Sequence, residues 1–344
     1  MLILIALLSQ FLMDNCHSLI MMDQPQNFVP MDVLRNAQPS TLCSSDAKVR
    51  LAKDEAYATA ILNAWKQEYV QGRESEKPTD SAIGTPWKYR RRSDGADLYG
   101  YIVSPVTTND AAKLPGILLF HTAAGPQDVF LRWKADSLVQ TLGCVVFIAD
   151  LLSDETGYCW TDKERYAATR GALLHPGKDD RPLLRETIEA ALLELQNHHL
   201  VCSDRIAALG WCLGGHPILE FGLMQDPAIK ALISYHGVFR GAVINEKFTE
   251  SNVNDDTSKK CQVLICHGVD DPFVDVADVE MAKEALIKHF GCEVNVLNFQ
   301  GVRHGFTNPA QDWHPNREAF GFDKNAAQVS WQETIQILKD AFID

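Results

Sequence analysis

The most constraining feature of the sequence is a short apolar run, residues 206–209, that leads directly into Gly-Trp-Cys-Leu-Gly-Gly at residues 210–215. A helix-like stretch follows at residues 217–224, so the order predicts a strand, a sharp turn and a helix. Glycines are needed in such a turn because its backbone lies close to neighbouring elements. Cys212 occupies the position where this connection presents a nucleophile, usually a serine. The Leu213 amide then lies at the helix N-terminus, where it would donate a hydrogen bond to a developing oxyanion.

An aspartate and a histidine follow later strands in the chain order that a nucleophile–acid–histidine site requires. The apolar run Cys261–Cys266 leads into Asp270 and Asp271, and the alternating run Val294–Phe299 is followed by His304. Both groups therefore stand after strands, at the sheet edge where ligands bind in open parallel sheets. A cysteine in a glycine-rich turn is, on its own, as often a buried core residue. The three residue types in this order favour a catalytic site instead.

Apolar strand-like runs alternate with helical patterns through most of the chain. This alternation predicts a mostly parallel sheet covered by helices on both faces. The segment Trp87–Ser104 alternates about Asp94-Gly95 and predicts an antiparallel hairpin in front of that sheet. The predicted strands lie at residues 116–120, 145–149, 206–210, 230–235, 263–266 and 294–299, and the predicted helices at 128–142, 181–198, 214–224, 277–289 and 325–342.

The chain has 344 residues, enough for one α/β domain of about 200–250 residues with an extension. We expect residues 1–45 to be loosely ordered and residues 46–86 to form an N-terminal helical extension, since Asp46–Gln71 has helical spacing. Residues 87–344 are expected to form the α/β domain.

The acidic balance of the chain limits its partners. A formal net charge of −13 disfavours nucleic acid and anionic membranes, which require a basic face. The dense basic run at residues 88–92 belongs to the predicted hairpin and indicates a solvated strand face. The expected partner is therefore a small molecule, and the pattern does not decide between a monomer and a homodimer.

The cysteines and the N-terminus bear on location. None of the nine cysteines forms a Cys-x-x-Cys pair, which argues against a metal site and favours a reducing, cytoplasmic compartment. The apolar stretch at residues 2–13 is too short to span a bilayer but has the length of a signal-peptide core. It has no preceding Lys or Arg and no clear cleavage site, so we expect a cytoplasmic protein, with secretion as the alternative.

Three motifs resemble the dienelactone hydrolase family: Gly-Trp-Cys-Leu-Gly-Gly, Asp-Asp-Pro-Phe-Val and Arg-His-Gly-Phe. The resemblance covers roughly residues 98–344 and implies an α/β-hydrolase fold that cleaves an ester or lactone without a metal or an organic cofactor. Matched position by position, it implies Cys212 as nucleophile, Asp271 as acid and His304 as base. Asp270 is the rival acid, but the family places its acid directly before a residue-Phe-Val run, which fits Asp271.

The residue types suit this chemistry. A free thiol has a pKa of about 8.5, so a nearby imidazole is needed to form the reactive thiolate at neutral pH. The thiolate would attack a carbonyl to form a thioester, which water would then cleave. One oxyanion donor is the Leu213 amide, and the other is expected in the loop after the strand 114–120. We assign it to the Ala123 amide, with Thr122 lining the pocket.

The sequence also departs from the family. Members carry a glutamate that helps to activate the thiol, and Thr122 stands at the matching position. They hold the substrate carboxylate with two arginines, whereas Thr307 and Asn308 stand at one of these positions. Arg165 and Arg170 are loose candidates for the other, and Trp211 and His236 are further candidates for the pocket. His121 and His267 also follow strands at this edge, where ordinary loop hydrogen bonding is the favoured interpretation.

Three functions fit these observations. The first is a cysteine hydrolase of small esters or lactones. The second is an acyl-transferring enzyme that uses the same thioester with another acceptor. The third is a non-catalytic binding or sensing protein that keeps the fold. Activity is expected to fall at acidic pH as His304 is protonated, unless a thiolate–imidazolium pair forms first.

Overall fold

The computed structural model describes residues 82–106, 113–126, 128–153, 163–177, 180–242, 244, 261–290, 293–314 and 316–343. The loosely ordered segment predicted at residues 1–45, its signal-like stretch and the helix predicted at Asp46–Gln71 lie outside these residues and stay predictions.

One eight-stranded sheet forms the centre of the described chain, in the order β1-β2-β4-β3-β5-β6-β7-β8. The first two strands pair antiparallel with each other, and β2 pairs antiparallel with β4, whereas all other neighbours are parallel. The mostly parallel sheet predicted from the alternation is therefore confirmed. The strands are β1 (Ala82–Arg90), β2 (Asp97–Pro105), β3 (Leu114–Phe120), β4 (Val145–Ala149), β5 (Val201–Trp211), β6 (Ile229–Tyr235), β7 (Gln262–Gly268) and β8 (Glu293–Phe299).

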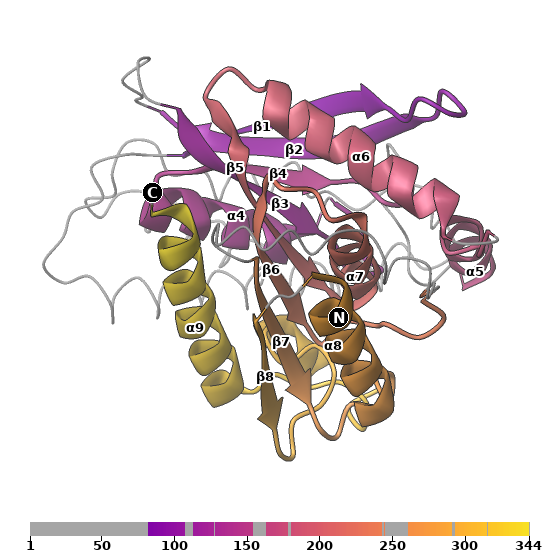
Figure 1. Ribbon diagram of the computed structural model, residues 1–344. Coiled ribbons are helices and arrows are strands. Elements are labelled where there is room, and N and C mark those ends of the chain that lie inside the picture. Colours follow the sequence, from indigo (N-terminus) through magenta and orange to yellow (C-terminus); the bar gives the residue numbers. More distant parts are fainter. Residues whose placement is uncertain are drawn as a thin grey trace, which may run out of the picture.

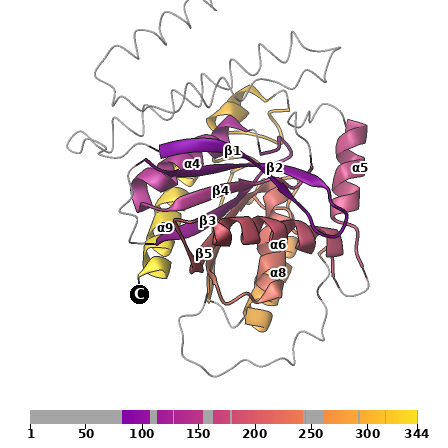
Figure 2. The same ribbon diagram turned by 90° about the horizontal axis from the view of Figure 1, so that it is seen from above.

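Helices cover both faces of this sheet, as Figures 1 and 2 show. Helices α4 and α9 pack on one face, and α6, α7 and α8 pack on the other. The helices are α4 (Val129–Leu142), α5 (Lys163–Leu173), α6 (Pro182–Asn197), α7 (Gly215–Met224), α8 (Val276–Phe290) and α9 (Lys324–Phe342). Helix α5 was not predicted; its polar composition obscures the apolar period that marks the others.

The core lies on both sides of the sheet because successive side chains of a strand point to opposite faces. In β3, Leu118 and Phe120 belong to the cluster under α6 and α7, whereas Ile117 and Leu119 belong to the cluster under α4 and α9. All four side chains are fully buried. The central strands are therefore continuous apolar runs in the sequence. Because they are parallel, their carboxyl ends lie at one edge of the sheet.

The predicted hairpin is present but starts earlier than expected. Strand β1 begins at Ala82, so residues 82–86 belong to the sheet and not to a helical extension. They pair with β2 through its last residues, Tyr101 to Pro105. The predicted boundary at residue 87 is thus wrong, because pairing with a strand further along the chain overrides a weak local pattern.

Three of the four cations in the basic run of the hairpin pair with acidic neighbours within the hairpin. Lys88 Nζ lies 2.7 Å from Asp97 Oδ2, and Arg90 Nε lies 2.9 Å from Asp97 Oδ1. Arg91 is buried and pairs with Asp94 at 2.6 Å. In the part of the chain that the structure describes, no helix is long and apolar enough to cross a membrane.

Candidate active site

The three residues singled out as nucleophile, acid and base come together at the carboxyl edge of the sheet. Cys212 follows β5 directly, Asp271 follows β7, and His304 lies in the loop after β8. Strands β7 and β8 are direct neighbours in the sheet, and β6 lies between β5 and β7. Residues far apart in sequence therefore meet because parallel strands end at a common edge.

Cys212 lies in a strained turn. Its φ is +52°, in the left-handed region that residues other than glycine seldom adopt. The strain is held by the surroundings: the Cys212 carbonyl accepts hydrogen bonds from the Val238 N–H at 2.9 Å and from the Gly215 N–H. A Cβ on Gly214 would lie 2.5 Å from the carbonyl oxygen of Phe120, so only glycine lets the turn approach β3. Such strain is typical of functional sites.

The acid and the base are directly bonded. His304 Nδ1 lies 2.6 Å from Asp271 Oδ2, and both side chains are buried. The other carboxylate oxygen, Oδ1, accepts a hydrogen bond from the Phe273 N–H at 2.8 Å. Asp270, the rival acid, is exposed, and its N–H donates to the Val302 carbonyl. The carboxylate thus fixes the imidazole with the Nδ1 proton toward Asp271 and leaves Nε2 for Cys212.

The electrostatics of the pair favour a thiolate beside an imidazolium. Burial raises the pKa of the Cys212 thiol, but the charge of His304 and hydrogen bonds from its ring and from the Leu213 N–H lower the pKa below 9.0 overall. For His304, burial lowers the pKa, whereas the Cys212 thiolate and the Asp271 hydrogen bond raise it to about 10. Each charge stabilises the other, so of the two pH behaviours left open above, the geometry favours the preformed ion pair.

Aromatic rings surround the imidazole. The ring centroids of His236, Phe273 and Phe320 lie 4.6, 5.1 and 5.3 Å from that of His304. Phe273 remains 43% exposed, which is high for a large apolar side chain next to a buried ion pair. His236 is buried against the imidazole with a φ of +41°, and burial lowers its pKa well below the ordinary range. A neutral His236 therefore adds no competing charge.

Of the two backbone segments expected to hold an oxyanion, one is the elbow itself and the other follows β3, whose last residue the elbow approaches. The Leu213 N–H hydrogen-bonds to the Cys212 thiolate and thus points to the side where a substrate would react. In the loop after β3, Ala123 and Thr122 are half-buried. The Thr122 hydroxyl accepts a hydrogen bond from the Ala124 N–H at 3.1 Å, so it closes the local turn. The loop approaches the elbow because Gly214 packs on the end of β3.

Comparison with known proteins agrees with this arrangement. The model of the dienelactone hydrolase family matches residues 98–342. The chain belongs to the dienelactone hydrolase family.

Relatives of this dienelactone hydrolase family member are distant in sequence. A Bradyrhizobium protein named as a probable 2-oxo-3-(5-oxofuran-2-ylidene)propanoate lactonase is 22% identical over 247 residues, 72% of this chain and 91% of that one. An uncharacterized Caenorhabditis elegans protein is 27% identical over 159 residues, 46% of this chain and 94% of that one. The crystal structure of a dienelactone hydrolase-like promiscuous phosphotriesterase from metagenomic libraries, 22% identical, superposes with a TM-score of 0.61 and covers 76% of this chain and 100% of that one. These likenesses show the α/β-hydrolase fold.

Both arginines considered for binding a substrate carboxylate lie on helix α5. Arg165 is exposed on α5. Arg170 lies on the same helix, half-buried, and affects His216: burial first, then the charges of Arg181 and Arg170, lower the pKa of His216 well below its ordinary range. Thr307 and Asn308 are both buried in the loop after His304. Arg303, the residue before His304, donates a hydrogen bond to the Arg317 carbonyl in the same loop.

Trp211 packs in the core. Its indole is fully buried and stacks on Tyr235 with centroids 4.8 Å apart. It also meets Phe130 of α4 edge to face. As the last residue of β5 it points to the α4 side of the sheet, so we do not carry it forward as a pocket residue.

Two arrangements near the site escaped the sequence analysis. The side chains of Arg181 and Glu220 form a fully buried ion pair at 2.9 Å between α6 and α7, and Arg181 Nη1 also lies 2.9 Å from His216 Nδ1. The second arrangement is the hydrogen-bonding of His121, described below. Glu220 could have been noticed in the sequence, because it is a charged residue within the otherwise apolar helical stretch 217–224. No local signal could reveal that the Leu151 N–H donates to His121, because Leu151 follows a different strand.

Among the described residues, no group of three or more His, Cys, Asp or Glu is arranged to hold a metal ion.

Proposed function

We propose that this member of the dienelactone hydrolase family is a hydrolase of small carboxylic esters or lactones that works through Cys212, His304 and Asp271. The observation that carries the proposal is the buried 2.6 Å hydrogen bond between Asp271 and His304. The same imidazole is also hydrogen-bonded to the Cys212 thiol of the elbow. Chemistry of this type needs an activated thiol, an oriented base and backbone donors for the oxyanion. The chain offers each of these at one edge.

In the first half-reaction, the Cys212 thiolate attacks the substrate carbonyl carbon, and its electron pair forms the C–S bond. The carbonyl oxygen becomes an oxyanion that the Leu213 and Ala123 N–H groups would stabilise. Collapse of this intermediate breaks the C–O bond, and the His304 imidazolium gives its Nε2 proton to the leaving oxygen. A thioester remains on Cys212. For a lactone, the leaving alcohol stays attached to the acyl chain.

In the second half-reaction, water attacks the thioester while neutral His304 accepts one of its protons. The C–S bond breaks, the carboxylic acid leaves, and the thiolate–imidazolium pair is restored. Asp271 holds the imidazole in one orientation throughout and stabilises its positive charge. Thr122 cannot act as a base, so the proposed activation of the thiol depends on His304 alone.

The substrate class follows from the lining of the site. With Thr307 and Asn308 at the family's arginine position, an uncharged ester or lactone fits better than an anionic dienelactone. The Bradyrhizobium relative is named as the lactonase of an unsaturated furanone, which supports including lactones. Dienelactone, the substrate of a carboxymethylenebutenolidase, therefore enters the proposal only as the substrate against which other esters are compared.

A reducing, cytoplasmic compartment suits this chemistry, since a reactive thiolate must stay reduced. All five cysteines in the described ranges are free.

The test compares p-nitrophenyl acetate and a dienelactone as substrates for the wild type, Cys212→Ala, Cys212→Ser and Cys202→Ala. Turnover is expected to disappear in Cys212→Ala and to persist in Cys202→Ala, a matched loss of a free thiol on β5. Cys212→Ser should be far slower than wild type, because an alkoxide is harder to form than a thiolate. Acid quenching during turnover should trap an acetyl group on the Cys212 peptide, detected by mass spectrometry.

Each alternative has its own outcome. Acyl products that appear only after an alcohol or amine is added would identify an acyl transferase. Unchanged turnover in Cys212→Ala would contradict the proposal, and binding of a lactone without turnover would support a binding protein.

A further inference from the structure

The direction of one expected oxyanion donor, the Ala123 N–H, depends on how the carbonyl of the same peptide group is hydrogen-bonded. The candidate donor is the Ala123 N–H, which shares its peptide plane with the Thr122 carbonyl. In a trans peptide these two groups point in opposite directions. Whatever holds the Thr122 carbonyl therefore aims the Ala123 N–H.

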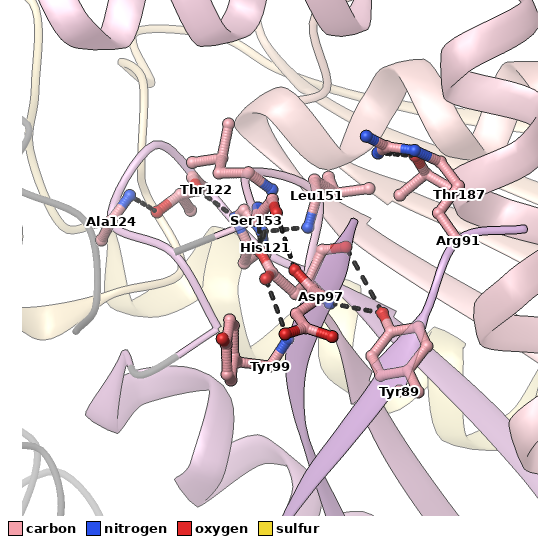
Figure 3. A network of polar contacts seen from close by, with 12 residues as sticks. Tyr89, Arg91, Asp97, Tyr99, His121, Thr122, Ala124, Leu151, Ser153 and Thr187 are labelled. Atoms are coloured by element: carbon pink, nitrogen blue, oxygen red, sulfur yellow. Dashed lines mark hydrogen bonds and ion pairs between the residues drawn. The ribbon is translucent and has the colours of Figure 1, made fainter. Parts of the chain in front are cut away.

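The Thr122 carbonyl is held by the ring of the preceding residue. His121 Nδ1 lies 2.6 Å from the Thr122 oxygen, which also accepts from the Gly125 N–H at 3.2 Å. The other ring nitrogen, Nε2, accepts a hydrogen bond from the Leu151 N–H at 2.9 Å (Figure 3). Since Nε2 is an acceptor, the ring proton is on Nδ1 and is donated to Thr122.

The Leu151 N–H is itself presented by a rigid turn after β4. Asp150 Oδ1 accepts from the Leu152 and Ser153 N–H groups at 2.8 and 3.1 Å, and Oδ2 accepts from the Tyr99 N–H at 3.0 Å. The Asp150 N–H donates to the Tyr89 hydroxyl at 3.0 Å. Figure 3 shows these contacts running from the β1–β2 hairpin to the loop after β3. The Nε2 side of the His121 ring is therefore held by the turn after β4, and that turn is itself hydrogen-bonded to β1 and β2.

The ring stays neutral under ordinary conditions. His121 is fully buried, and burial lowers its pKa to about 4. Its Nε2 therefore remains an acceptor and its Nδ1–H a donor across the pH range in which the thiolate forms.

We propose that His121 is a positioning residue for catalysis: by donating from Nδ1 to the Thr122 carbonyl, it aims the Ala123 N–H at the oxygen of a substrate bound to Cys212. The proposal rests on the proposed function, because it assigns an orienting group to one of its oxyanion donors. Without the donation the 122–123 peptide could turn, and the N–H would leave the site.

Two substitutions separate the two hydrogen bonds of the ring. In His121→Asn the amide nitrogen takes about the place of Nδ1, so donation to Thr122 is kept and the link to Leu151 is lost. In His121→Gln the amide reaches about the place of Nε2, so the link to Leu151 is kept and donation to Thr122 is lost. The pair is matched in polarity and differs in the bond that is retained.

We expect His121→Gln to lower kcat on p-nitrophenyl acetate by at least about tenfold, and by no more than the roughly 100- to 1000-fold that complete loss of an oxyanion donor costs. KM should change little, and His121→Asn should stay within about threefold of wild-type kcat. Alkylation of Cys212 by iodoacetamide, followed on its peptide by mass spectrometry, should keep its wild-type rate in both variants. Displacement of iodide from carbon develops no oxyanion, so this reaction reports the thiolate alone.

Equal losses of kcat in the two variants, or wild-type kcat in His121→Gln, would overturn the proposal. So would an alkylation rate that falls in parallel with kcat, which would indicate a disturbed site. If His121→Gln does not fold, the wild type still decides: ¹⁵N-histidine NMR must show the Nδ1–H tautomer for His121, and the Nε2–H tautomer would refute the geometry. Failure of the proposed function is separate, because it would appear as turnover that survives Cys212→Ala.

Discussion

The half-buried Cys212 thiol and the buried His304 imidazole share one proton, and the position of that proton decides when the site is reactive. Because the pKa of Cys212 is lowered below 9.0 and that of His304 is raised to about 10, the thiolate–imidazolium state occupies the window between the two. The imidazole loses its proton only above that window, and the thiolate gains one only below it.

The alkylation rate of Cys212 should therefore rise with pH through a midpoint below the ordinary pKa of a thiol and stay level toward about pH 10. The measurement is iodoacetamide incorporation at the Cys212 peptide as a function of pH. In His304→Gln the stabilising charge is absent while burial still raises the pKa, so the midpoint should move upward. A wild-type midpoint at or above that of His304→Gln would show that no ion pair forms.

At the scale of elements, the elbow requires β5, α7 and β3 to approach closely. Gly214 makes this possible, since a Cβ there would lie 2.5 Å from the backbone oxygen of Phe120, which cannot rotate away. We expect Gly214→Ala to destabilise the fold by about 1–3 kcal/mol and to lower turnover by displacing Cys212. Gly171→Ala in α5 is the control, because its Cβ would meet nothing within 4 Å. That change should stabilise by roughly 0.5–1 kcal/mol. Urea unfolding measures both, and equal stability of the two would be contrary to a steric role.

Helices α6 and α7 are joined by the buried charges of Arg181 and Glu220. Glu220 also accepts a hydrogen bond from Arg185 Nε at 2.5 Å. Glu220→Gln keeps the shape but leaves buried positive charge uncompensated, so we expect a loss of about 3–5 kcal/mol in the free energy of unfolding. Glu280→Gln removes the exposed pair with Lys283 at 2.9 Å and should cost less than about 1 kcal/mol. Similar losses for the two variants in urea unfolding would argue against a structural ion pair.

At the scale of the whole molecule, buried neutral histidines make stability depend on pH. His121, His216 and His236 all have a pKa lowered by burial. Each binds a proton near pH 6.5 only when the chain unfolds, so the stability they contribute is present above about pH 6.5 and is lost as the pH falls toward their folded pKa values. His304 behaves oppositely: its contribution is complete below about pH 6.5 and is lost toward its raised pKa of about 10.

The free energy of unfolding should therefore decrease between pH 6.5 and 5 by up to about 1.4 kcal/mol per pH unit for each buried neutral histidine. Denaturant unfolding at a series of pH values measures this slope. His121→Asn should reduce this slope by the contribution of one buried neutral histidine. A stability that is constant from pH 7 to 5 would mean that these rings are already protonated in the folded protein.

Much of the fold could be predicted from residues near one another in sequence. The strand before Cys212, the glycine turn and helix α7 were visible because side-chain periods and turn glycines are local properties. The same holds for the succession of strands along the chain and for the positions of Asp271 and His304 after them. The start of β1 and the existence of α5 were not visible. Pairing with β2 decides the first, and the polar sequence of α5 leaves no clear apolar period.

By itself the sequence determined the fold class, the elbow and a short set of candidate side chains, because local propensity and the succession of strands along the chain follow from neighbouring residues. Only the tertiary structure placed Asp271 rather than Asp270 against His304, buried Trp211 between Tyr235 and Phe130, and surrounded His121 with partners from other strands. Side-chain direction, burial and charge depend on which residues from distant segments meet. In this protein those distant contacts lower the pKa of the Cys212 thiol and hold the His121 ring through the Leu151 N–H, and neither effect can be read from a local pattern.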